Sequence, residues 1–272
     1  MIQISQFGPV TRFDLARALP AWRYWTTAYL VDGLLVDSGC AHCVGETLAA
    51  LAGTPLAWIA NTHTHEDHIG ANGTLQSQYP GLEIYAHPQA LPVLEDPQGM
   101  QPLHPYRRLF WGWPTPSIGK PVENGDVIST DQYQLQVIYT PGHSSDHFCL
   151  YESNQGWLFS GDLFVGGQER ALRAGTDIWQ LIASLKRIAE LPMSWLFPGS
   201  ARVRKNPSNE VNRKIAYLEK LGDEVVALSD RGWNVERIAR KLLGPTKQVE
   251  LITLGHFSRR CLVLSYLGLN QE

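Results

Sequence analysis

The segment NTHTHEDHIG, residues 61–70, places three histidines and two carboxylates within six consecutive positions. It directly follows the apolar run LAWIA at 56–60 and ends at Gly70. A polar loop at the end of a strand is a common place for functional residues. Charged side chains are seldom buried unless they are paired or bound to a metal. The segment therefore predicts a metal site rather than a solvated turn.

The spacing within this segment divides its side chains into two groups. Side chains two positions apart on extended backbone point the same way, so His63 and His65 can share one ion. Asp67 and His68 suit a neighbouring ion, at the bend of the chain. Imidazole and carboxylate are good ligands for zinc and iron. Glu66 lies on the opposite side from the two histidines, and we expect it to face solvent or to make a loop contact.

Two further motifs end apolar strands in the same manner. YTPGHSSDH at 139–147 places His143 after one predicted strand, and LFSGDLF at 158–164 places Asp162 after another. Either motif alone is typical of an ordinary glycine turn. Three strand-end motifs in this order favour a single site built from all of them.

The succession H-x-H-x-D-H, T-P-G-H and S-G-D resembles the metallo-β-lactamase superfamily of hydrolases. The resemblance covers roughly residues 20 to 205 and includes VDSG at 36–39 and FPGS at 197–200. It implies an α/β (α+β) fold, a four-layer αββα sandwich with the metals at one edge between two sheets. We expect this sandwich at 1–205 and a helical C-terminal extension packed on it at 206–272.

The resemblance also assigns roles to individual residues. The implied metal ligands are His63, His65 and His143 for a first ion, Asp67 and His68 for a second, and Asp162 as the bridge between them. Asp37 resembles the acidic residue behind the ligands, which orients a histidine or its loop. His147 resembles a family histidine four residues after a ligand, and it is expected to support the site or the sheet.

Position 200 departs from the family pattern. Members with two full sites usually have PGH where this chain has PGS, and a serine hydroxyl is a poor zinc ligand beside an imidazole. The second ion is therefore expected to be weak, water-rich or absent, although three ligands can suffice for a catalytic metal. His256 in TLGHFSRR is one candidate to fill the space left at Ser200. The plainer interpretation is that His256 caps or packs the last helix.

The metal set indicates hydrolysis by a metal-bound hydroxide. A bound metal lowers the pKa of water from about 16 to near 7, and Asp67 can orient this water and carry a proton to the leaving group. We expect a metal-dependent hydrolase of a small ester, thioester, lactone or amide. Asp67 after the two histidines and Asp162 at the bridge place it nearer glyoxalase II than true β-lactamases. One or two zinc ions are the expected cofactor, with iron or manganese as alternatives.

Two other functions compete with hydrolysis. Some superfamily members are iron-dependent sulfur oxidoreductases of the persulfide dioxygenase type, which use ligands equivalent to His63, His143 and Asp162 only. The loss at position 200 is compatible with that activity. A non-enzymatic domain with a degenerate site ranks last, because six of the seven expected ligands remain.

Substrate contacts are expected from a segment rich in prolines and aromatic residues, Asp96 to Gly119. Long ordered loops of this kind often cover active sites. The candidates in it are Tyr106, Arg108, Trp111 and Trp113. The competing interpretation is that its aromatic residues pack the segment onto the sandwich. Further candidates are Trp22, Tyr24 and Trp25, which line the same cleft or cover a sheet edge.

The net charge and the length of the apolar runs limit the kinds of partner that this chain can have. Its 272 residues carry a net charge of −3, which excludes an obvious basic surface for nucleic acid. Apolar runs are too short to span a membrane, and the first residues lack the features of a signal peptide. We expect a cytoplasmic protein with a small-molecule substrate, and a homodimer through the C-terminal helices is one option. Cys40 and Cys43 are interpreted as buried thiols at a helix start rather than a redox pair.

Overall fold

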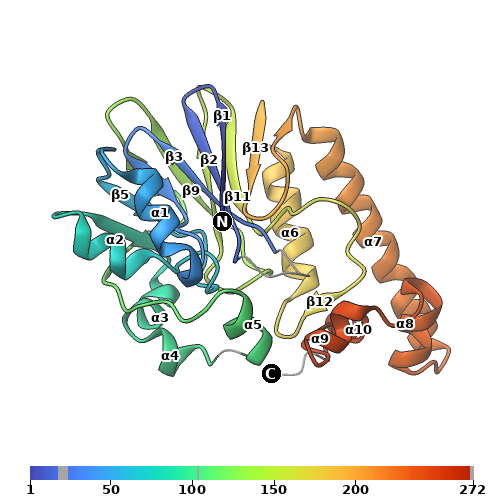
Figure 1. The fold of residues 1–272 in the computed structure, drawn as a ribbon. Helices are drawn as coiled ribbons and strands as arrows, with labels where there is room; N and C mark the ends of the chain where they lie inside the picture. Colours follow the sequence, from blue (N-terminus) through green and yellow to red (C-terminus); the bar gives the residue numbers. More distant parts are fainter. Residues whose placement is uncertain (18–23, 103, 270–272) are drawn as a thin grey trace. The chain divides into compact units, whose positions relative to one another are not determined.

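The computed structural model describes residues 1–17, 24–102 and 104–269 (Figure 1). Trp22 lies outside the described residues. The chain packs into two compact units, of which the first comprises residues 1–139, 146–165 and 194–205. The second comprises residues 140–145, 166–193 and 206–272. The predicted domain boundary after residue 205 stays a prediction.

The first unit contains a seven-stranded mixed sheet in the order β1 to β7. Its strands are β1 (Ile2–Phe7), β2 (Val10–Leu15), β3 (Thr26–Val31), β4 (Leu34–Val36), β5 (Trp58–Ala60), β6 (Glu83–Ala86) and β7 (Gly119–Pro121). Strands β1 to β4 pair antiparallel, and β4 to β7 pair parallel. The predicted turn between β3 and β4 is confirmed: Asp32 and Gly33 both have positive φ, 47° and 78°, as a tight hairpin requires.

A six-stranded sheet completes the first unit, in the order β14-β13-β11-β10-β9-β8. Its strands are β8 (Val127–Ser129), β9 (Gln134–Tyr139), β10 (Phe148–Glu152), β11 (Trp157–Gly161), β13 (Trp195–Pro198) and β14 (Arg204–Lys205). Because β11 and β13 run parallel, their carboxyl ends meet at one edge of the sheet. The loops that carry Asp162 and Ser200 both leave from that edge.

The helices of the first unit connect the parallel strands β4 to β7 of the first sheet. They are η1 (Ala41–Cys43), α1 (Val44–Leu51), α2 (Asn72–Gln78), η2 (Pro88–Ala90), α3 (Leu91–Glu95), α4 (Pro97–Met100) and α5 (Pro105–Phe110). The proline-rich segment therefore contains two short helices. Alternate side chains of each strand enter different clusters: Leu35 packs in a cluster with residues of α1, α2 and α3, whereas Leu34 and Val36 pack with residues of the second sheet.

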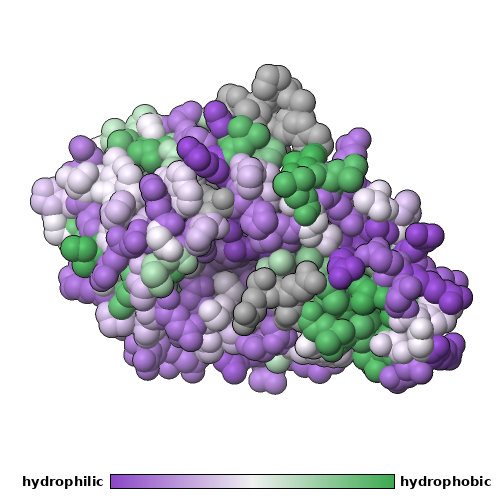
Figure 2. Space-filling view, turned by 90° about the horizontal axis from the view of Figure 1, so that it is seen from below, coloured by the Kyte–Doolittle hydropathy of each residue, from purple (hydrophilic) through white to green (hydrophobic). Residues whose placement is uncertain are grey.

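The second unit is mostly helical, as the sequence predicts for the tail. It contains α6 (Ile178–Ala189), α7 (Ser208–Asp230), α8 (Val235–Leu243), α9 (Gln248–Ile252), α10 (Arg259–Tyr266) and a small sheet of β12 (Leu172–Arg173) and β15 (Phe257–Ser258). The predicted apolar face of α6 is buried, from Ile178 to Leu185. No helix within the described ranges is long and apolar enough to cross a membrane. On the face drawn in Figure 2, hydrophilic residues predominate and hydrophobic residues form separate patches.

Candidate metal centre

The metal loop, residues 61–70, is buried along its whole length. Buried polar groups need hydrogen-bond partners, and neighbouring loops supply them. Thr64 donates its backbone N–H to the Asp146 carboxylate at 2.8 Å, and Ser38 donates its N–H to the His68 carbonyl at 2.7 Å. The loop is therefore a rigid part of the first unit rather than a solvated turn.

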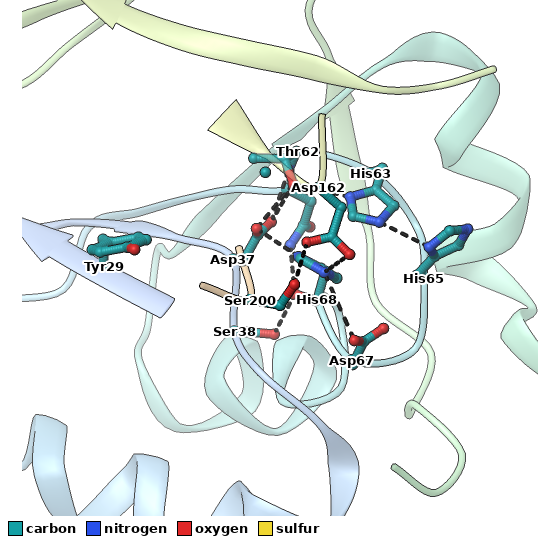
Figure 3. Close-up of polar contacts among 12 residues, drawn as sticks. Tyr29, Asp37, Ser38, Thr62, His63, His65, Asp67, His68, Asp162 and Ser200 are labelled. Carbon is teal, nitrogen blue, oxygen red and sulfur yellow. Dashed lines mark hydrogen bonds and ion pairs between the residues drawn. The ribbon is translucent and has the colours of Figure 1, made fainter. Parts of the chain in front are cut away.

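Asp37 lies directly after β4 and contacts the metal loop at two places, Thr62 and His68 (Figure 3). Its carboxylate accepts the backbone N–H of Thr62 at 2.8 Å and lies 2.7 Å from Nδ1 of His68. Its backbone has φ of 58°, a conformation that non-glycine residues adopt rarely and often at functional sites. A carboxylate on Nδ1 keeps the proton there and turns Nε2 outward, which is the usual arrangement behind a metal-bound histidine.

Nε2 of His68 is the atom that this arrangement presents. It is buried and has no hydrogen-bond partner within the described residues. It lies 3.7 Å from Oδ2 of Asp162 and 3.9 Å from Oδ2 of Asp67, beyond hydrogen-bond range. Burial lowers the pKa of His68, but the carboxylates of Asp37, Asp67 and Asp162 outweigh it and raise that pKa well above the usual value. An orphaned ring nitrogen facing two carboxylates fits a cation between them.

His63 and His65 converge at the other side of the same space (Figure 3). Nε2 of His63 and Nδ1 of His65 lie 2.9 Å apart, and the rings meet edge to face. Ligand atoms of His63, His68 and Asp162 all lie within 4.8 Å of one another. Imidazoles and a carboxylate grouped in this way are a donor set for zinc or iron. The residues present therefore fit a metal ion.

Asp67 adds a second charge to this space. Burial raises the pKa of Asp67 to about 7; His68 opposes the shift, and the nearby Glu66 and Asp162 carboxylates add to it. Such crowding of carboxylates disfavours ionisation unless a cation neutralises them. The negative charge of these carboxylates is thus another feature that a bound metal would neutralise.

Ser200 contacts the carboxylate that is predicted to bridge the ions. Its hydroxyl donates to Oδ1 of Asp162 at 3.1 Å (Figure 3). The approach is close because Gly199 precedes it: a Cβ there would lie 2.7 Å from both Asp162 Oδ1 and His68 Cε1. The serine that replaces the family histidine therefore orients Asp162.

Glu66 is not exposed, so of the two expectations for it, solvent or a contact with a loop, the first is wrong: it contacts Arg107 of the proline-rich segment. Its side chain is wholly buried. The Arg107 guanidinium of α5 donates two hydrogen bonds to it, from Nε to one carboxylate oxygen at 2.6 Å and from Nη2 to the other. The alternating pattern correctly turns Glu66 away from the histidines, but the pattern holds no information about what covers that side. The pair fixes α5 against the metal loop.

The rings of Tyr24, Trp111 and Tyr106 pack together in one aromatic group. The ring of Tyr24 lies 5.3 Å from that of Trp111, which lies 6.2 Å from that of Tyr106. Desolvation, together with the Asp162 and Asp67 carboxylates, raises the pKa of Tyr24. The sequence predicts all three aromatics as candidate substrate contacts, and that role stays a prediction.

The remaining predicted residues lie in different places. His147 is buried, with its ring 5.2 Å from that of His63. His143 lies in the 140–145 segment of the second unit, where its carbonyl accepts from Thr176 at 3.5 Å. His256 is also in the second unit, in the turn before β15, and its carbonyl accepts from Ala174 at 2.8 Å. The assigned roles of these three histidines stay predictions.

The family follows from a direct comparison. Residues 26–200 match the model of the Metallo-beta-lactamase superfamily. The chain belongs to that superfamily. The predicted fold is thereby confirmed, and solved structures agree: a metallo-beta-lactamase family protein from Thermus thermophilus superposes with a TM-score of 0.68, covering 96% of this chain and 92% of that one at 18% identity.

Curated relatives of two kinds are similar in sequence to this chain. The hydroxyacylglutathione hydrolase of Gloeobacter violaceus is 35% identical over 58% of this chain and 54% of its own. The atrochrysone carboxyl ACP thioesterase of Aspergillus fumigatus is 26% identical over 81% of this chain and 64% of its own. The chain spans about half the length of the first of these relatives. A further solved structure, TTHA1623 in a di-iron-bound form, is 30% identical with a TM-score of 0.56, covering 74% of this chain and 98% of that one.

Proposed function

We propose that this protein is a metal-dependent hydrolase of thioesters. The observation that carries the proposal is His68, held through Nδ1 by Asp37 so that its unpartnered Nε2 faces Asp67 and Asp162. The choice of thioester over ester, lactone or amide rests on the relatives, whose names describe hydrolysis of a hydroxyacylglutathione and of an acyl carrier thioester.

The chain offers ligands for two adjacent ions. His63, His65 and His143 would hold one, Asp67 and His68 the other, and Asp162 both. A bound metal supplies Lewis-acid polarisation of the thioester carbonyl and lowers the pKa of a water to near neutrality. Zinc is the first candidate, and iron or manganese are alternatives.

The protein's own groups set the geometry of the reaction. Asp37 keeps the proton on Nδ1 of His68, and Ser200 donates to Oδ1 of Asp162 and so fixes that carboxylate. The Asp67 carboxylate, buried beside His68, would accept a proton from the attacking water and pass it to the departing thiolate. Buried surroundings keep these groups aligned and exclude other proton acceptors.

A second candidate is iron-dependent oxidation of a sulfur compound. It is favoured by Ser200, which leaves the second ion one imidazole short. The di-iron form of TTHA1623 is a precedent for iron in a protein similar to this chain.

The test is a thioester assay on protein purified without added metal. Released thiol is followed with a chromogenic disulfide, and the same sample is analysed for bound metals. We expect thiol release that a chelator abolishes and added metal restores. Asp162→Ala should lose it, and Asp223→Ala, an exposed carboxylate on α7, should retain it. Oxygen uptake with a persulfide and no thioester hydrolysis would instead support oxidation.

A further inference from the structure

A basic groove lies beside α5 in the first unit. It has a volume of about 560 Å³, and three segments line it: the end of β2, η1, and α5 with the residues after it. The side chains that matter here are Arg17, His42, Arg108, Leu109 and Trp113. Among the described residues, no carboxylate lines the groove.

The two guanidinium groups of the groove lack acidic partners in the part of the chain that the structure describes. Neither Arg17 nor Arg108 forms an ion pair there. Arg17 donates Nη1 to the Leu109 carbonyl and lies 3.3 Å from Nε2 of His42. Most other arginines and lysines described in the first unit have a carboxylate or an aromatic ring beside them. Two such guanidiniums at one cavity favour an anion, because each can give two parallel hydrogen bonds to a phosphate or carboxylate.

The wall of the groove is fixed rather than formed by loose side chains. His42 donates its backbone N–H to the Trp111 carbonyl at 3.1 Å, and its Nε2 lies 3.2 Å from the Arg108 carbonyl. Gly112 has φ of 77°, and a Cβ there would lie 3.0 Å from the His42 ring. Glycine at this position thus permits both the turn and the close approach of the imidazole.

Trp111 and α5 connect this groove to the metal centre. Arg107, the neighbour of Arg108, binds Glu66 inside the metal loop. The backbone carbonyl of Trp111 accepts from the N–H of His42, while its ring packs on that of Tyr24. The indole N–H of Trp111 is buried and has no hydrogen-bond partner among the described residues.

We propose that the basic groove binds the phosphate of a phosphopantetheine-type thiol carrier, the anion on the thiol side of an acyl thioester whose carbonyl lies at the metal centre. This inference rests on the proposed function. In free 4′-phosphopantetheine the phosphate is a monoester with up to two negative charges, which matches two guanidiniums better than a single carboxylate does. The pantetheine arm is partly apolar, and Leu109, which is 52% exposed, and Trp113 offer it an apolar wall.

Binding of the carrier alone tests the groove without any hydrolysis. The probes are 4′-phosphopantetheine and pantetheine, which differ by one phosphate, titrated into the metal-loaded protein by calorimetry. We expect phosphopantetheine to bind at least tenfold more tightly than pantetheine. Arg17→Gln and Arg108→Gln should each weaken phosphopantetheine binding roughly tenfold, the loss of one charge-assisted interaction. Arg231→Gln, an exposed arginine after α7 with no ion pair among the described residues, is the matched control and should change neither affinity.

The outcomes separate the groove from the proposed function. Equal affinity for the two probes, or affinities unchanged in both arginine variants, would overturn the groove even if thioesters are hydrolysed. Tighter binding of glutathione than of phosphopantetheine would overturn the phosphate assignment in favour of a carboxylate. If binding depends on the phosphate and is lost in both arginine variants, the groove is supported. This holds even if the protein hydrolyses no thioester, a result that would contradict only the proposed function.

Discussion

The metal loop and the proline-rich segment both carry candidate functional side chains, but they differ in how deeply they are buried. The metal loop is buried throughout, and its side chains bond to Asp37, Asp146 and one another. The proline-rich segment, Asp96 to Gly119, is mostly exposed or half-buried, and Arg107 is its buried charged anchor. The predicted ligands are thus buried and fixed by many bonds, whereas the predicted substrate contacts lie on a more exposed segment, held by the Arg107–Glu66 pair and by hydrogen bonds with His42 and Gln76.

The largest effect is expected inside the metal loop's ligand set. Asp162→Ala removes the carboxylate that faces His68 and accepts from Ser200. We expect bound metal to fall below half and thioester turnover to drop by about 10² or more, since aligned charged groups contribute this much. His65→Ala should behave alike. Metal analysis and the thiol assay measure both, and unchanged metal content in either variant would contradict the assignment.

The next test concerns the ion pair between Glu66 of the metal loop and Arg107 of the proline-rich segment. Glu66→Gln leaves the Arg107 guanidinium buried without its charge partner, which typically costs about 3–5 kcal/mol of stability. Denaturant unfolding should show that loss, while metal per folded chain stays near the native value. The double variant Glu66→Gln with Arg107→Met should recover part of the stability. Metal loss equal to that of Asp162→Ala would mean that Glu66 acts in the metal site itself.

A smaller effect is expected from the carboxylate behind the ligands. Asp37→Asn keeps the shape but weakens control of the Nδ1 proton of His68. We expect metal affinity to fall by about 10–100-fold, the usual cost of changing such a partner. Competition with a chromogenic chelator measures this, with Asp223→Asn as the control. An unchanged affinity would show that the Asp37 contact serves folding only.

The pH dependence of the metal-free protein should reveal the crowded charges of the loop. Burial raises the pKa of Asp67 to about 7. Above that pH the buried carboxylate is ionised and lowers the stability of the fold, and this loss of stability diminishes as the pH falls. The raised pKa of His68 gives stability that is full below its unfolded pKa of 6.5 and is lost as pH rises. Both signs predict a higher melting temperature at pH 6 than at pH 8 without metal. Added metal should stabilise more at pH 8, where the ligands are deprotonated.

The mildest change is expected at position 200. Ser200→His restores the imidazole common in the family and should raise metal per chain, whereas Ser200→Ala removes only the hydrogen bond to Asp162. Inductively coupled plasma analysis of the three proteins, purified side by side, gives the comparison. A native protein that already binds two ions per chain would contradict the expected weakness of the second site.

The sequence predicts the two regions unequally. Short-range periodicity places the strands before His63 and Asp162, the turn at Asp32 and Gly33, and the buried face of α6. Motif order predicts the ligand set, and the structure brings ligand atoms of His63, His68 and Asp162 within 4.8 Å of one another. By contrast, the hairpin of β1 and β2 escapes prediction, because β1 is a largely exposed edge strand with little apolar patterning.

Contacts between distant positions are what the pattern cannot give. Glu66 and Arg107 are 41 residues apart, and Ser200 and Asp162 are 38 apart. Neither pairing has a local signal, because it depends on which loops the sheets bring together. The same holds for the basic groove, where Arg17 and Arg108 meet only through the packing of α5. The sequence therefore names Arg108 and Trp113 as candidates one by one, but only the structure shows that Arg108 and Arg17 line the same groove.

The central claim is that the metal loop and Asp162 hold a metal that drives thioester hydrolysis. The most direct measurement is thiol release from one thioester by native protein, by chelated protein, and by chelated protein given back a measured amount of zinc or iron. The account predicts activity that disappears with the chelator and returns in proportion to metal bound, and that Asp162→Ala does not regain it. Thiol release that is unaffected by complete removal of metal, or its absence from fully metal-loaded native protein, would contradict the account.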